Sequence, residues 1–227
     1  MSIARELVIA GPAAVDRLAY DGVRAETLPS LRRRLLSKLA PEISIASREA
    51  SRLAIRAGLI SLKQAEFPAR AASFARTVEA FDAALGALYL AGVDPALLDR
   101  AGRVGRARTL GDVMRATDLA LEKIAQLDRR AVARHLAHVV SQSSPDDVVV
   151  AVGTRRLVAR VVAWGGADAM LWRALDASLS RAGGEAKVEL PLFEKAIDAE
   201  RERDPLEELV DAIARKLDAA PTTIAVP

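Results

Sequence analysis

Apolar residues recur at helical spacing through residues 68–91. They are separated by three or four residues in alternation, which places all of them on one side of an α-helix; they are Ala71, Phe74, Val78, Phe81, Leu85 and Leu88. Arginine and acidic side chains occupy the opposite face, so we expect that face to be solvated. The pattern predicts a helix that packs on another helix of the chain, with an intermolecular coiled coil as the alternative.

A second long helix is predicted to begin at Thr109. The sequence Thr-Leu-Gly-Asp places a carboxylate three residues after a threonine, which is a variant of the capping box that starts many helices. Apolar positions continue at drifting helical spacing to about residue 140, and the charged run Asp128-Arg129-Arg130 is a point at which the helix could divide. We expect this helix to lie antiparallel to the helix at 68–91, joined to it by a short helix at 94–102 and a loop.

Prolines and glycines predict about six helices within residues 1–142. The prolines stand where first helical turns would begin, and the glycines follow the periodic segments, as helix-ending residues do. One of these helices, at residues 28–39, carries Arg32, Arg33 and Arg34. We expect this basic face to be solvated, with an anionic membrane surface as the alternative.

After residue 142 the pattern becomes β-branched. Residues 148–152 and 157–164 read as two strands joined by Gly-Thr-Arg-Arg, which predicts a β-hairpin. The alternative is one helix with an internal glycine, because Ser-Pro-Asp-Asp at 144–147 is also a good helix start. Beyond it we expect a helix at 167–182, a short strand at 187–190, two amphipathic helices at 191–203 and 205–217, and an extended, uncharged arm at 219–227.

These elements predict a mainly α fold in two domains. Residues 1–142 are expected to form a multi-helix bundle, and residues 143–227 a smaller α+β module with the short β-hairpin and the C-terminal arm. The content of apolar residues, 51% of 227, is ample for a packed core.

Composition excludes several chemistries. Because the sequence has no cysteine, disulfides, thiolate metal sites, iron–sulfur clusters and cysteine nucleophiles are all ruled out. The longest uncharged apolar stretch, residues 83–91, is about half the ~20 residues that a membrane span needs. The first residues contain no basic segment followed by an apolar run, so we expect no secretory signal and a cytoplasmic location.

Charge is divided unequally along the chain. Residues 1–142 hold 22 basic and 15 acidic residues, whereas residues 143–227 hold 11 basic and 15 acidic residues. The two parts therefore favour partners of opposite charge, and each other.

Candidate catalytic and metal-binding groups are sparse. The two histidines, His135 and His138, lie three residues apart on a predicted helix, but no Glu or further His stands at the spacing that a metal site requires. No serine lies in a nucleophile motif. The paired carboxylates Asp146 and Asp147 occupy a predicted helix start, where the helix dipole stabilises acidic side chains. We therefore predict no catalytic, cofactor-binding or metal-binding residue and no cofactor.

One basic loop has the physics of an anion site. Residues 101–109 are rich in glycine and arginine and precede a predicted helix N-terminus, although the loop is not a Walker A motif. The candidate contacts for an anion or nucleic acid are Arg100, Arg103, Arg106 and Arg108, with Arg129, Arg130 and Arg134 as further basic residues. A helix-turn-helix at residues 50–67 is disfavoured, since Gln64 stands where an apolar residue is expected and Pro68 cuts the second segment.

The sequence therefore favours a non-catalytic structural or adaptor protein. Such a protein would assemble through its helix faces, as a homo-oligomer or as a subunit of a larger complex with protein partners. The alternative is a nucleic-acid-associated protein that binds phosphates through its basic N-terminal half.

Overall fold

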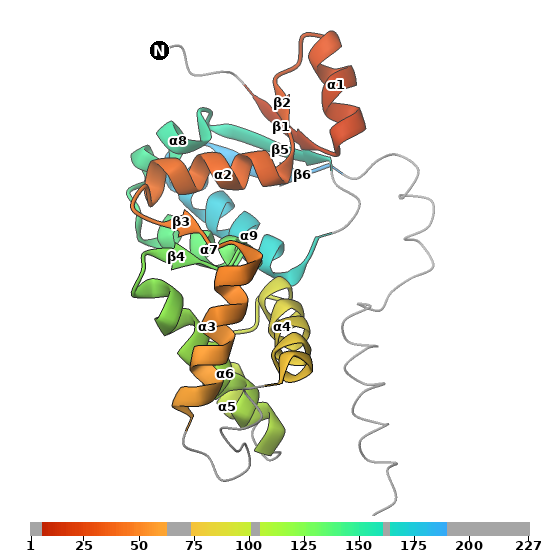
Figure 1. The fold of residues 1–227 in the computed structure, drawn as a ribbon. Helices are drawn as coiled ribbons and strands as arrows, with labels where there is room; N and C mark the ends of the chain where they lie inside the picture. The colour runs from red at the N-terminus through yellow and green to blue at the C-terminus, as the bar shows by residue number, and fades with distance from the viewer. Residues whose placement is uncertain (1–5, 63–73, 101–104, 161–163, 190–227) are drawn as a thin grey trace, which may run out of the picture. The chain divides into compact units, whose positions relative to one another are not determined.

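Four consecutive apolar residues near the start of the chain form the centre of a parallel sheet. The computed structural model describes residues 6–62, 74–100, 105–160 and 164–189. Strand β1 (Leu7–Ala10) is buried along its whole length, which is typical of a strand covered on both faces of a parallel sheet. It pairs in parallel with β2 (Ala25–Glu26) and with β5 (Arg156–Arg160), and β5 pairs in parallel with β6 (Glu185–Val188). The sheet order is β2-β1-β5-β6 (Figure 1).

Helices α2 (Leu28–Leu39), α7 (Val132–Gln142), α8 (Pro145–Val152) and α9 (Gly166–Arg181) share one core with the sheet. Helix α1 (Pro12–Tyr20) follows β1 and has no buried residue. Leu7 and Ile9 of β1 and Leu157 and Ala159 of β5 pack with buried residues of α2, α7, α8 and α9. The sheet thus takes strands from both sides of residue 142, where the sequence suggested a domain boundary.

A group of helices lies between two short strands that pair with each other. Strands β3 (Ser44–Ile45) and β4 (Gln126–Leu127) form a two-stranded parallel ladder. Between them the chain forms α3 (Arg48–Ser61), α4 (Ala75–Leu90), α5 (Pro95–Arg100) and α6 (Gly105–Glu122), which we call the helical insertion. It has its own core, composed of Ile55, Leu59, Val78, Leu85, Tyr89, Val113 and Met114, and Ala131, which follows β4, packs with it. The insertion therefore begins and ends at the β3–β4 ladder.

The predicted β-hairpin is wrong. Residues 145–152 are helical, because Ser144 accepts a hydrogen bond from the backbone N–H of Asp147 at 3.1 Å and Pro145 occupies the first turn. Gly153 ends the helix with φ +73°, in the left-handed region that glycine adopts without strain. The next segment is β5, whose partners are β1 and β6. The alternative of one continuous helix is also wrong, since the chain becomes a strand after Gly153.

Other predictions divide between confirmed and corrected. Helix α4 confirms the described part of the helix at 68–91, α9 confirms the helix at 167–182, and β6 confirms a short strand near residue 187. The helix predicted from Thr109 begins earlier, at Gly105, so Thr109 is not its N-cap, and one helix to residue 140 is wrong: α6 ends at Glu122, and Ala125, with φ +52°, leads into β4. The alternative, a division at Asp128-Arg129-Arg130, is confirmed, since these residues lie between α6 and α7. The helices predicted after residue 190 and the C-terminal arm lie outside the described residues. Most of the described residues are helical, and none of their helices is long and apolar enough to cross a membrane.

Candidate functional site

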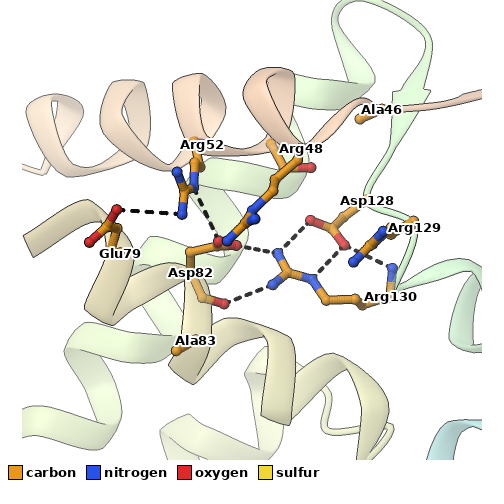
Figure 2. A pocket seen from close by; sticks show the side chains of 10 residues that line it. Ala46, Arg48, Arg52, Glu79, Asp82, Ala83, Asp128, Arg129 and Arg130 are labelled. Carbon is orange, nitrogen blue, oxygen red and sulfur yellow. Dashed lines mark hydrogen bonds and ion pairs between the residues drawn. The ribbon is translucent and has the colours of Figure 1, made fainter. Parts of the chain in front are cut away.

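A charged cavity of about 590 Å³ opens between α3, α4 and the connection from β4 to α7 (Figure 2). Arginine and carboxylate side chains dominate its lining, which consists of Ala46, Arg48, Ser51, Arg52, Glu79, Asp82, Ala83, Asp128, Arg129 and Arg130. Arg48 and Arg52 reach it from α3, Glu79 and Asp82 from α4, and the other charged groups from the β4–α7 connection. The β3–β4 ladder thus brings together segments that are far apart in the sequence.

Asp128 is the most deeply buried charged group of this cavity, with 1% of its surface exposed. Its carboxylate accepts hydrogen bonds from Arg130 Nε at 2.9 Å and Nη2 at 2.8 Å, and from the Arg130 backbone N–H at 2.8 Å. Burial alone raises the pKa of Asp128, but the hydrogen bonds and charge of Arg130, with the Ser51 hydroxyl, outweigh it and lower the pKa. Asp128 is therefore an ionised carboxylate that fixes Arg130.

Arg130 joins two buried carboxylates. Besides Asp128, its Nη2 atom lies 2.7 Å from Oδ1 of Asp82, and its Nη1 atom donates to the Asp82 backbone carbonyl at 2.9 Å. Hydrogen bonds to Asp128 raise the pKa of Arg130 further above its already high value. The Arg130 guanidinium is thus permanently charged and is held against Asp82 of α4. Its N–H groups donate to oxygen atoms of the protein.

Arg52 pairs with the third carboxylate of the cavity, Glu79, and shares Asp82 with Arg130. Its Nε atom donates to Oδ2 of Asp82 at 3.4 Å, and its Nη2 atom lies 3.6 Å from Oε1 of Glu79. Each of the three carboxylates is therefore paired with an arginine. Arg48 and Arg129 are exposed and form no ion pair with another residue in the described part of the chain. The lining holds four arginines and three carboxylates, so it presents a net positive charge.

This arrangement suits an oxyanion. A guanidinium offers planar, forked donors that match the oxygens of phosphate or carboxylate. Arg48 is also the first residue of α3, whose N-cap Ser47 accepts from the Ala50 N–H at 3.1 Å, so the partial positive charge at the start of this helix lies beside it. The cavity thus combines two unpaired arginines with a rigid frame of ion pairs.

Of the four arginines predicted in and beside the basic loop, Arg108 is the one whose side chain the structure describes, and it does not line the arginine cavity. Arg108 lies exposed on α6, and the side chains of Arg100, Arg103 and Arg106 lie outside the described residues, so their role stays a prediction. Of the further basic residues, Arg129 and Arg130 line the cavity, whereas Arg134 is held by Asp118 at 2.9 Å and by the Val93 carbonyl at 3.0 Å. Among the described residues, no three His, Asp or Glu side chains are placed to hold a metal ion.

Sequence reasoning missed Arg48, Arg52, Asp82 and Asp128 as site residues. We expected the acidic side chains of the helix at 68–91 to be solvated, yet Asp82 is only 7% exposed. The adjacent charges Asp128-Arg129-Arg130, at a point where apolar periodicity fails, were the available signal.

Comparison with protein-family models and with curated proteins finds no match to the chain.

Proposed function

We propose that the protein is a non-catalytic binding protein that holds the phosphates of single-stranded nucleic acid in the arginine-lined cavity. The observation that carries this proposal is the pair Arg48 and Arg129, exposed on the lining and without an ion-pair partner among the described residues. Beside them, Arg130 is fixed between Asp82 and Asp128. An anion that enters the cavity therefore meets the unpaired guanidinium groups of Arg48 and Arg129 beside this fixed ion pair.

The state of the carboxylates supports binding rather than catalysis. A general base must be free to accept a proton from a substrate. Glu79, Asp82 and Asp128 are each paired with an arginine, so the cavity offers cations and not a free base.

Single strands fit this geometry better than a duplex. The cavity is concave, whereas duplex DNA is read by helices or strands that project into a groove. A flexible strand can place one or two phosphates in a concave, positively charged site. The net positive charge of residues 1–142 would favour the approach of the same polyanion.

The test is fluorescence anisotropy of a labelled single-stranded oligodeoxynucleotide with the wild-type protein and the double variant Arg48→Ala/Arg129→Ala. The logarithm of affinity falls with the logarithm of salt by about 0.7 per phosphate contact, so the double variant should have a slope shallower by about 1.4. The matched control is Arg56→Ala, since Arg56 is exposed on α3 but does not line the cavity. Equal slopes for the two variants, or no binding at low salt, would refute the proposal.

A second candidate function is that of an adaptor that assembles through helix faces. It is supported by Leu53 and Ile60 of α3, which are 65% and 56% exposed and lie two helical turns apart on one stripe. We propose a homo-oligomer as its simplest form, and a cytoplasmic location for either function. Light scattering coupled to size-exclusion chromatography should then give more than one chain per particle, and Leu53→Glu/Ile60→Glu should give one. A wild-type monomer at high micromolar concentration would exclude self-assembly.

A further inference from the structure

A second and larger cavity lies on the other side of the β3–β4 ladder. It has a volume of about 1030 Å³ and runs along α7, between α9 and the C-terminal end of α6. Ile43 and Gln126 line this cleft, whereas Ala46 and Asp128 line the arginine cavity, so the two sites are neighbours along the same short strands. Its size is at the upper limit of the usual range for small-molecule sites, about 300–1,000 Å³.

Two buried polar atoms of the cleft residues have no hydrogen-bond partner in the described part of the chain. They are Oε1 of Gln126, on β4, and Nε2 of His135, on α7. A buried donor or acceptor without a partner costs free energy, so such atoms are uncommon in folded proteins. Two of them belong to residues on the lining of one cleft, where a ligand could supply the missing hydrogen bonds after a small adjustment of these side chains.

The two side chains whose polar atoms lack a partner are uncharged. Burial lowers the pKa of His135, the positive charges of His138 and Arg134 lower it further, and Glu42 opposes them. The imidazole is therefore neutral near pH 7, and one of its ring nitrogens accepts while the other donates. Together with the Gln126 amide, it offers both donor and acceptor groups.

Three of the six charged residues that line the cleft, Asp94, Asp118 and Arg134, are bonded to other protein groups. Asp118 accepts from Tyr89 Oη at 2.6 Å and from Arg134 Nη2 at 2.9 Å, and Asp94 accepts from the Ala96 N–H at 2.7 Å. The lining as a whole holds four carboxylates and two arginines, so it disfavours a phosphate group. Apolar walls come from Ile43, Leu127 and Met170, among others.

We propose that this cleft binds a nucleobase, with Gln126 and His135 as the residues that recognise its edge. A base is planar, has apolar faces and carries neutral donors and acceptors on its edge, which matches the apolar walls and the two unpaired polar atoms. Its backbone phosphate stays outside the acidic cleft. The inference deepens the proposed function. It rests on that function in one respect: the base would belong to a nucleic-acid strand whose other phosphates occupy the arginine cavity.

The experiment is isothermal titration of the full chain with free adenosine, guanosine, cytidine and uridine, which carry no phosphate. At least one nucleoside should bind, and Gln126→Leu and His135→Phe should each weaken it tenfold or more. The corresponding nucleoside monophosphate should bind no more tightly than the nucleoside. Ser143→Ala is the matched control, because Ser143 follows the same helix α7 and its hydroxyl is bonded to the Val139 carbonyl at 2.8 Å, but it does not line the cleft; it should bind like the wild type.

A second readout covers the possibility of misfolding. Because each substitution replaces a buried polar atom that lacks a partner, Gln126→Leu and His135→Phe should keep or raise the melting temperature of the free protein, by up to roughly 2–4 °C. A structural role for the two side chains would instead lower it. Loss of nucleoside binding together with such a lowered melting temperature would count against the proposal.

The outcomes separate this inference from the proposed function. Nucleoside binding that survives in Arg48→Ala/Arg129→Ala, with no oligonucleotide binding by the wild type, would support the base site and refute the phosphate site. Oligonucleotide binding that depends on the two arginines, with no nucleoside bound at millimolar concentration, would refute the base site alone. Tighter binding of spermidine than of every nucleoside would also refute it, since the cleft would then be a site for organic cations.

Discussion

Arg130 donates two hydrogen bonds to the carboxylate of Asp128, only two residues before it, from Nε at 2.9 Å and from Nη2 at 2.8 Å. The same guanidinium lies 2.7 Å from Oδ1 of Asp82 on α4. A pair that is local in sequence therefore joins the end of β4 to the helical insertion. This pair stabilises the fold and holds together two of the segments that line the cavity. Arg48 and Arg129 line the same cavity without an ion-pair partner in the part of the chain that the structure describes.

Asp128→Ala should destabilise the protein strongly. The substitution leaves a partly buried guanidinium without its main partner, and breaking such a pair costs about 3 kcal/mol or more. The free energy of unfolding from urea titration measures it. The control is Glu189→Ala, which removes the ion pair to Arg160, whose side chains are 34% and 45% exposed; this should cost less than about 1 kcal/mol. Equal losses in the two variants would show that Asp128 does not anchor the site.

Gly166→Ala should destabilise the contact between α9 and the end of α4. A Cβ atom at Gly166 would overlap the backbone carbonyl of Ala91, which cannot turn aside as a flexible side chain could. Overpacking of this kind costs about 1–3 kcal/mol. Ser180→Ala, at an exposed position of the same helix, should change stability by less than about 0.5 kcal/mol. Thermal unfolding of both variants checks the prediction, and indistinguishable midpoints would contradict it.

The sequence predicts helices better than strands in this chain, for a physical reason. Helix signals are local: the period of α4 and the flanking glycines of α9 lie within the elements themselves. Strand β1 has only four residues, and its partner β5 lies about 150 positions away, so no local pattern reveals the pairing. For α8 the local caps, Ser144 and Gly153, were the correct guide, and the β-branched composition of residues 148–152 was not.

The candidate site was hidden from sequence reasoning for a related reason. Asp82 lies at helical spacing from both Val78 and Leu85, on the buried face of α4, but an aspartate is normally solvated, so its residue type argues against burial there. Arg130, 48 residues later, neutralises it and allows its burial. Such a pairing depends on the tertiary fold, so spacing alone could identify neither the buried carboxylates nor the unpaired arginines beside them.

Tyr89→Phe should weaken the core of the helical insertion. Tyr89 is fully buried, its hydroxyl donates to Asp118 at 2.6 Å, and Arg134 lies over its ring at 5.2 Å. Loss of a hydrogen bond to a charged group costs about 1.5–3 kcal/mol. Tyr20→Phe is the matched control, because Tyr20 is 93% exposed, and it should be neutral. Urea unfolding compares the two variants, and a neutral Tyr89→Phe would show that Asp118 is satisfied by Arg134 alone.

The stability of the wild-type protein should fall relative to His135→Phe as the pH decreases below about 6.5. Burial is the main cause that lowers the pKa of His135 in the folded state, with the charge of His138 next. The unfolded chain therefore binds a proton at a higher pH than the folded chain does, so protonation favours unfolding. The contribution of the neutral histidine is present above the unfolded pKa of 6.5 and is lost as the pH falls through the window between that value and the lower folded pKa. Urea unfolding of both proteins at closely spaced pH values from 8 to 5 measures the difference. Parallel stability curves over that range would mean that His135 titrates alike in both states, and its assignment as a neutral hydrogen-bonding group of the cleft would then fail.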